Sequence, residues 1–301
     1  MHKYDDYLPT ELTDRLGKMA ESNERLNISL TNDFAFKTIF HNVKALTGLL
    51  SAALEIPAEE IETLIFPETI LTGEYLEDKE GILDVKIIMN NHKKVNVELQ
   101  IRKFPFWEER SLFYNCRMFT ENFERGMDYS KLETCIQISI LNFDLHEGNE
   151  LFSKVGLVDL ESGHVYSDKF SFRVLYLNHI DDASEAEKQT DIYKWARMIS
   201  TTDPLELENI AAGNEYMKEA YKEMERINSD KALRYRYLKE EMEESDRATI
   251  RYGGYLEGEA RSEARLTQLN LKLLAEKNYA ELEAASKDKN YRDALLKKYG
   301  L

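Results

Sequence analysis

The chain has 301 residues, a formal net charge of −16 at pH 7 and an apolar content of 43%. This length fits about two globular units. The two cysteines, Cys116 and Cys135, are too few for a disulfide framework. No apolar run approaches the roughly 20 residues that a membrane-spanning helix needs, and the N-terminus M-H-K-Y-D-D-Y lacks an apolar signal segment. We therefore expect a cytoplasmic protein that does not bind membranes.

The N-terminal part of the chain is predicted to be helical and then extended. Residues 1–26 are polar and charged and predict an irregular or partly helical lead-in. Thr31 and Asn32 are N-cap candidates for a helix whose apolar residues keep helical spacing as far as Leu50. Pro57 marks the end of this helical region, and residues 66–75 predict the first strand.

Residues 81–89 and 95–102 each alternate apolar and polar side chains with a period of two. This pattern predicts two adjacent strands joined by a turn at residues 90–93. On the polar side of both strands lie Asp84, Lys86, Asn96, Glu98, Gln100 and Arg102. Two carboxylates on one face of a sheet form a hard-oxygen cation site, which suits the hydrolysis of phosphodiesters.

The same alternation also fits a hairpin with one buried and one solvated face. Lys86 and Glu98 would then be no more than a cross-strand ion pair. Alternation specifies a half-buried strand and no chemistry, so the spacing alone leaves both interpretations open.

A helix is predicted after the hairpin, with Pro105 in its first turn and Gly126 at its C-terminal cap. Its aromatic side chains are expected to pack on the sheet. Arg110 and Arg117 are seven residues apart, lie on one face of this helix and could reach phosphates. A solvated helix face explains them equally well.

Three more strands are predicted at residues 134–143, 151–160 and 170–177, with a turn at Ser162-Gly163 between the last two. From residue 184 onward the composition and spacing are helical. Gly253, Gly254 and Gly258 are expected to interrupt these helices. We interpret the charged C-terminal helices as an interaction or homo-oligomerisation element, with a solvated helical extension as the alternative.

Five sequence blocks in this order resemble a known family. They are T-N-D-F-A-F-K-T-I-F (31–40), L-T-G-E-Y-L-E-D-K-E-G-I-L-D-V-K (71–86), N-V-E-L-Q (96–100), E-R-S-L-F-Y (109–114) and I-S-I-L-N-F (138–143). Over residues 30–176 the chain is similar to the PD-(D/E)XK nuclease superfamily and, more narrowly, to the bacterial PD-(D/E)XK nuclease family transposases, also called recombination-promoting nucleases. The superfamily has Lys where this chain has Gln100, but Glu-x-Gln is the form that this branch uses.

The resemblance implies an α/β, restriction-endonuclease-like core with the order helix, three strands, helix, strand and a mixed sheet, followed by a C-terminal helical extension. We expect the nuclease-like domain at residues 27–200, between the lead-in at 1–26 and a charged helical C-terminal region at 201–301.

The resemblance also implies roles for individual residues. Asp84 and Glu98 would hold Mg²⁺ or Mn²⁺ through their side chains, and Leu99 through its backbone carbonyl. Gln100 stands where a lysine normally orients or activates the attacking water. Because an amide carries no charge and cannot act as a base, the metal would have to supply most of the activation.

Two further residues are candidates for this site. Lys86 follows Asp84 by two residues on the same strand face and could supply the missing positive charge, or it could pair with Glu98. Asp33 could hold a water bound to the metal, or it could be a first-turn acid that the helix dipole favours.

The net charge of −16 slows encounter with a polyanion. Basic residues nevertheless predominate between residues 86 and 117, which predicts a locally positive groove beside the site. The candidates for binding nucleic acid there are Arg102, Lys103, Arg110 and Arg117. The expected function is that of a metal-dependent DNA endonuclease linked by resemblance to transposition or recombination. The alternatives are a catalytically retired nuclease fold that acts as a partner-binding scaffold, and a structure-specific RNase.

Overall fold

The computed structural model describes residues 10–22, 24–67, 70–71, 81–82, 84–90 and 92–301. The chain forms two compact units, one extending to Glu240 and one from Glu241 to Leu301. We call these the first and second units. The first unit ends later than the boundary expected after residue 200, because α7 (Pro204–Ala212) and α8 (Glu215–Ser229) pack into it, α8 against α2 and α3.

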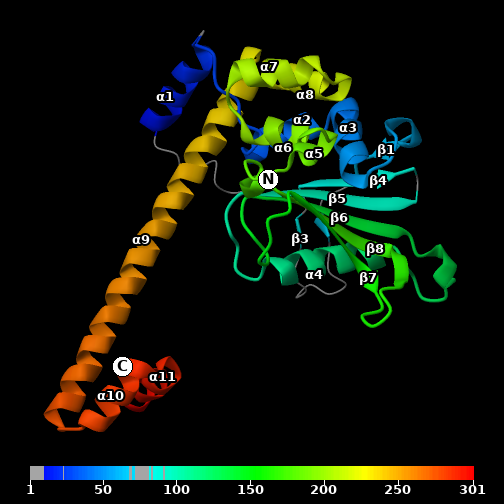
Figure 1. Ribbon diagram of the computed structural model, residues 1–301. Helices are drawn as coiled ribbons and strands as arrows, with labels where there is room; N and C mark the ends of the chain where they lie inside the picture. Colours follow the sequence, from blue (N-terminus) through cyan, green and yellow to red (C-terminus); the bar gives the residue numbers. More distant parts are fainter. Residues whose placement is uncertain (1–9, 23, 68–69, 72–80, 83, 91) are drawn as a thin grey trace. The chain divides into compact units, whose positions relative to one another are not determined.

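A six-stranded mixed sheet forms the centre of the first unit (Figure 1). Its strands, in spatial order, are β1 (Leu64–Ile65), β4 (Val85–Met89), β5 (Lys93–Gln100), β6 (Thr134–Leu141), β8 (Val165–Tyr176) and β7 (Phe152–Val158). Strand β5 is antiparallel to β4 and parallel to β6, and β6 is parallel to β8. The expected α/β class with a mixed sheet is confirmed. The short strands β2 (Ile70–Leu71) and β3 (Gly81–Ile82) pair only with each other.

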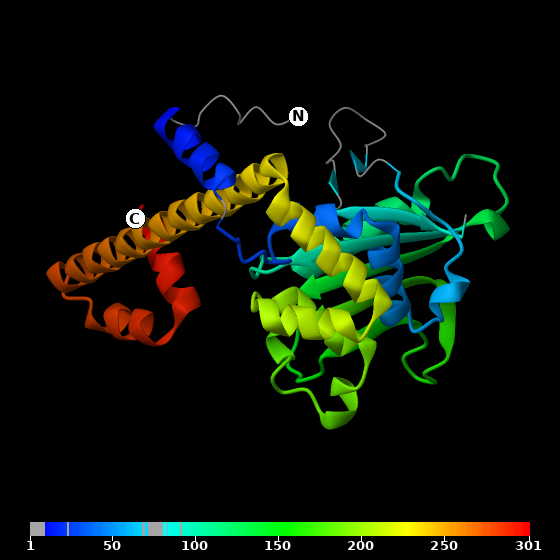
Figure 2. The same cartoon turned by 90° about the horizontal axis from the view of Figure 1, so that it is seen from above.

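Helices cover both faces of the sheet (Figure 1). On one face lie α2 (Asp33–Phe40), α3 (Val43–Leu54), α6 (Asp191–Ser200) and α8, and on the other lies α4 (Trp107–Thr120). Figure 2 shows the first group of helices from above. Val85, Ile87, Met89, Val95 and Val97 of β4 and β5 are fully buried. The rings of Phe36, Phe40 and Trp195 pack against one another in tilted pairs, with centroids 4.7 and 5.7 Å apart. This is the main hydrophobic core.

The predicted N-cap of the first helix is confirmed, but the helix is shorter than expected. The Asn32 side chain accepts a hydrogen bond from the Ala35 N–H and begins α2. Asn42 then caps a new helix, α3, by accepting from the N–H groups of Lys44 and Ala45. A side-chain cap in the middle of the apolar pattern therefore divides it into two helices. Within the predicted first strand at residues 66–75, residues 70–71 form β2, and residues 68–69 and 72–75 lie outside the described part of the chain.

Helix α4 ends at Thr120, six residues before the glycine expected to cap it. The buried Lys94 ammonium donates to the carbonyls of Met118 and Glu121, which satisfies the end of the helix from the sheet. Gly126 has φ +93° in the loop that follows. The predicted turn at Ser162-Gly163 is confirmed, since it joins β7 to β8 and Gly163 has φ +71°.

The second unit consists of the larger part of α9 (Lys231–Ala275) with α10 (Tyr279–Lys287) and α11 (Lys289–Lys298). Leu269 and Leu273 of α9 pack with Ala285, Leu295 and Leu296. The expected interruption at Gly253, Gly254 and Gly258 is wrong, because α9 continues through all three. A glycine costs a helix about 1 kcal/mol relative to alanine, which the rest of a long helix offsets.

The remaining helical segments are α1 (Thr10–Glu21), α5 (Glu185–Lys188), η1 (Ala58–Glu60), η2 (Tyr129–Lys131) and η3 (Leu177–His179). Every described helix is either too short or too polar to cross a bilayer.

Replacing Gly48 by Ala tests the packing of α8 on α3. An added Cβ at Gly48 would lie 2.2 Å from Tyr216 Cβ and 3.1 Å from Trp195 Cζ2, so the core must shift. We expect Gly48→Ala to lower the free energy of unfolding by about 1–3 kcal/mol in urea denaturation. Gly254→Ala is the matched control, because nothing lies within 4 Å of its added Cβ and alanine favours a helix by up to about 1 kcal/mol. Equal effects of the two substitutions would contradict this packing.

Candidate active site

Asp84 and Glu98 face each other across β4 and β5. In this antiparallel ladder Val85 pairs with Val97, so one further residue places Asp84 opposite Glu98. Residues in such positions have Cβ atoms about 4.5–5.5 Å apart. The Glu98 side chain is 3% exposed and that of Asp84 16% exposed. Two carboxylates are thus held close together with little exposure to solvent.

Asp84 is bound by its own hairpin and by α2. The Leu99 N–H donates to Asp84 Oδ2 at 3.0 Å, and Lys37 Nζ lies 3.2 Å from Asp84 Oδ1. Lys37 also donates to Asp33 Oδ2 at 2.9 Å. Lys37 therefore bridges the two aspartates, and this bridge places Asp33 beside the site.

Glu98 accepts hydrogen bonds from a side chain of α4 and from its neighbours in the sheet. Arg110 Nη2 donates to Glu98 Oε1 at 3.0 Å, while Asn96 Nδ2 and Gln137 Nε2 both approach Oε2 at 3.3 Å. The Arg110 guanidinium lies 5.1–5.3 Å from three ring centroids, those of Phe104, Trp107 and Tyr114. These cation–π contacts hold the guanidinium over the carboxylate.

Burial makes the ionised form of this pair costly. It raises the pKa of Glu98 to about 7, with a further increase from the charge of Asp84 and a partial decrease from Arg110. Burial also raises the pKa of Asp84, against the opposing effect of Lys37. The pKa of Lys37 is lowered by burial, but the carboxylates of Asp84 and Asp33 outweigh this effect and raise it overall. Lys37 is therefore a charged donor.

The backbone carbonyl of Leu99 is a third oxygen near the two carboxylates. Its N–H points to Asp84, and the N–H and C=O of one strand residue point to the same side. The next carbonyl, of Gln100, points the other way and accepts from the Asn142 N–H at 3.2 Å. The Leu99 carbonyl therefore faces the edge where Asp84 lies.

The donor set fits a hard divalent cation. Mg²⁺ binds oxygen ligands, commonly one or two carboxylates together with water, and two carboxylates with one carbonyl satisfy that preference. Within the described part of the chain, no group of three or more His, Cys, Asp or Glu side chains is placed to hold a metal. Of the four residues predicted to hold a metal, Asp84, Glu98 and Leu99 lie together, and Asp33 contacts Lys37 beside them.

The family model for PD-(D/E)XK nuclease family transposases matches residues 30–252. The chain belongs to this family. No curated protein and no solved structure matches it. The matched range extends through α7 and α8 to the first part of α9, in keeping with the inclusion of α7 and α8 in the first unit.

Gln100 and Lys86, which were also predicted from the PD-(D/E)XK pattern, make their contacts with residues other than the two carboxylates. Gln100 follows Glu98 on the same strand face, and its Nε2 donates to the Arg102 carbonyl at 2.8 Å. Lys86 is buried opposite Asn96, and its Nζ lies 2.7 Å from Glu121 Oε1. The alternative ion pair of Lys86 with Glu98 is thus replaced by one with a residue from the end of α4.

The alternative interpretation, in which the polar face of the hairpin is solvated, is wrong. Lys86, Lys94, Asn96, Glu98 and Gln137 are all buried, because α4 covers this side of the sheet. The expected positive groove is correspondingly reduced, since Lys86 and Lys94 pair with Glu121 and Glu133. Arg102 and Lys103 are exposed. The Arg117 guanidinium lies over the Phe113 ring at 5.8 Å.

Lys37 is the site residue that the sequence reasoning missed. It belongs to the block T-N-D-F-A-F-K and follows Asp33 by one helical turn, so a contact between these two was predictable. Its contact with Asp84 depends on α2 packing beside the hairpin, which no local pattern indicates.

Replacing Arg110 by Met tests whether Glu98 is a buried charge that needs a partner. An acid whose pKa is raised in the folded state destabilises the fold as pH rises through that pKa, here about 7. Without Arg110 the ionised Glu98 has no cationic partner, so the loss of folding free energy at high pH should be larger. We expect Arg110→Met to lower the free energy of unfolding by about 1–3 kcal/mol at pH 8, and by clearly less at pH 5, where Glu98 is protonated. Urea denaturation in a chelator measures both values.

Arg110→Lys is the control, because it keeps a positive charge beside Glu98 and its effect should depend less on pH. A loss for Arg110→Met that does not depend on pH would contradict the role assigned to Glu98.

Proposed function

We propose that this protein is a metal-dependent DNA endonuclease that hydrolyses phosphodiester bonds in transposition or recombination. The observation that carries the proposal is the buried pair of carboxylates, Asp84 and Glu98, which lie opposite each other. A cationic side chain from a helix contacts each of them. Membership in a nuclease transposase family supports the reaction class.

Asp84, Glu98 and the Leu99 carbonyl would hold the cation, Mg²⁺ or Mn²⁺. When bound, such a cation lowers the pKa of water and offsets the charge of a phosphate. Because it would also neutralise the carboxylates, Lys37 and Arg110 would be free to turn towards phosphate oxygens. Both side chains are donors only, as a phosphodiester anion requires.

We assign to Lys37 the role that a lysine on the third strand has in the superfamily. Gln100 holds that strand position without a charge, and the charge of Lys86 is bound to Glu121. Lys37 is 3.2 Å from Asp84 and is kept protonated by two carboxylates, so it can donate to the attacking water or to the phosphate. A positive donor fixed before the reaction stabilises the negative charge that develops in the transition state. Arg102 and Lys103, exposed beyond the end of β5, are candidates for contacts with flanking phosphates.

A plasmid assay tests the nuclease proposal. Supercoiled plasmid with Mg²⁺ should be nicked or linearised by the wild-type chain, while Asp84→Asn should show no detectable cleavage, because the amide keeps the shape and the Leu99 hydrogen bond but loses the charge. Asp168→Asn, an exposed aspartate on β8, is the matched control and should cleave like wild type. Cleavage by Asp84→Asn at the wild-type rate would exclude Asp84 from the site.

Lys37→Met separates catalysis from metal binding. Removing the ammonium should lower the cleavage rate by about 100-fold, a typical cost for one transition-state donor. Isothermal titration with Mn²⁺ should show unchanged or tighter binding, because Lys37 no longer competes for Asp84 Oδ1. Lys44→Met on α3 controls for loss of a surface charge. Weaker Mn²⁺ binding in Lys37→Met, or cleavage at the wild-type rate, would refute this assignment.

A retired nuclease fold that works as a scaffold is the second candidate. Gln100, which cannot act as a base, and the net charge of −16 favour it. The same Mn²⁺ titration discriminates, since a retired site has no need to bind the cation. An RNase would use every residue named here, and only a comparison of RNA and DNA substrates separates it.

A further inference from the structure

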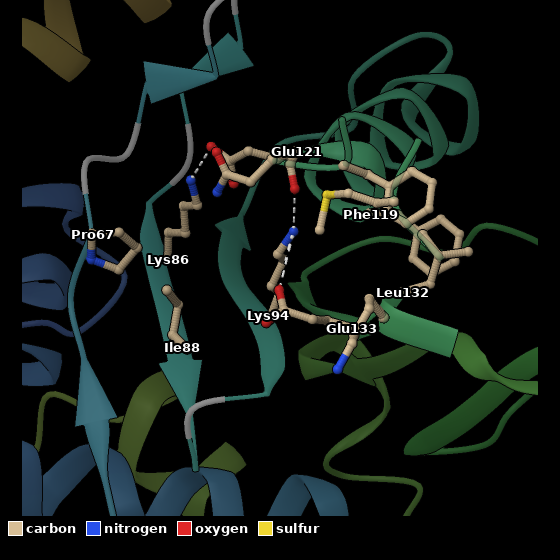
Figure 3. A pocket seen from close by; sticks show the side chains of 12 residues that line it. Pro67, Lys86, Ile88, Lys94, Phe119, Glu121, Leu132 and Glu133 are labelled. Carbon is tan, nitrogen blue, oxygen red and sulfur yellow. Dashed lines mark hydrogen bonds and ion pairs between the residues drawn. The ribbon is translucent and has the colours of Figure 1, made fainter. Parts of the chain in front are cut away.

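The first unit contains a pocket on the same sheet face as Asp84 and Glu98, beside the C-terminal end of α4 (Figure 3). Its volume is about 370 Å³, within the roughly 300–1,000 Å³ of pockets that hold small molecules. Its wall comes from β4, β5, the end of α4 and the segment before β6. The residues that line it include Lys86, Lys94, Phe119, Phe123 and Lys131.

The charged residues of this pocket favour an anion. Three lysines and two glutamates line it, which gives a net charge of +1 in a chain whose total is −16. Glu121 and Glu133 pair with Lys86 and Lys94 at 2.7 and 3.3 Å, so these four charges offset one another. Lys131, exposed in the rim, adds the third positive charge.

Aromatic side chains make up the other part of the pocket. Phe119 and Phe123 line it, and the Phe123 ring stacks on Tyr129 with centroids 5.8 Å apart. The Tyr129 side chain is 79% exposed, and Met127 beside it is 41% exposed. Lysines next to exposed, stacked rings are the combination that proteins use for unpaired nucleotides, because rings stack on bases and ammonium groups bind phosphates.

The pocket lies next to the candidate site. Lys86 follows Asp84 by two residues on the same face of β4, and Lys94 has the same relation to Asn96 beside Glu98. Two residues of strand span roughly 7 Å, which is about the rise of two nucleotides. A nucleotide in the pocket would therefore be close to a phosphate at the two carboxylates.

We propose that this pocket binds one unpaired nucleotide of the substrate, so that the preferred substrate is a strand with unpaired bases rather than an intact duplex. This inference rests on the proposed nuclease function. The base would lie against Phe123 and Phe119, with Asn122 available to its polar edge, and the phosphate would lie near Lys131.

Fluorescence anisotropy with a short labelled oligothymidylate tests the proposal on the full chain in the presence of EDTA. The single strand should bind more tightly than the same oligonucleotide annealed to its complement. Phe123→Leu, which keeps an apolar side chain but removes the ring, should weaken binding of the single strand by about tenfold. Lys131→Ala should weaken it less and reduce its dependence on salt concentration.

Tyr166→Leu, an exposed aromatic on β8, and Lys194→Ala, an exposed lysine on α6, are the matched controls and should bind like wild type. Equal binding of single strand and duplex, or unchanged binding by Phe123→Leu and Lys131→Ala, overturns the proposal. Because EDTA prevents cleavage, the result does not depend on nuclease activity. Tight single-strand binding that these variants weaken would support the pocket even if the plasmid assay failed.

Discussion

The antiparallel register of β4 and β5 is the constraint on which the candidate site depends. It places Asp84 opposite Glu98, where α4 excludes most of the water. Burial removes water from both carboxylates and raises the pKa of each, with a further increase from Asp33 for Asp84 and from Asp84 for Glu98. A fold that keeps this pair must bring positive charge to it, because an unpaired buried charge is among the most destabilising groups in a protein.

The positive charge comes from two helices on opposite sides of the sheet. Helix α2 brings Lys37 to Asp84, and helix α4 brings Arg110 to Glu98. Each is held in its own way: Lys37 by Asp33 one turn earlier on its helix, and Arg110 by the rings around its guanidinium. The candidate site is therefore balanced in charge before any cation binds, and the residues that balance it are of the types that bind phosphate.

The polar face of the hairpin serves more than one purpose. Near one end it carries the two carboxylates, and further along it carries Lys86 and Lys94, which bind the end of α4 and line a pocket. Because these lysines are buried and paired, they add little to long-range attraction of a polyanion, and the chain as a whole is acidic. In the function proposed above, recognition of nucleic acid therefore relies on short-range contacts at the candidate site and the pocket.

Alternation with a period of two was enough to place Asp84, Glu98 and Gln100 on one face, and a helical pattern after a capping residue was enough to find the start of α2 at Asn32. These features depend on residues close together in the chain, so the sequence determined them by itself. Only the tertiary structure decided that α4 covers the polar face and that Lys94 of β5 binds the carbonyls at the end of α4. It also decided that Lys37 contacts Asp84. Each of these depends on segments far apart in sequence meeting in the folded chain, and local spacing carries no information about which segments will meet.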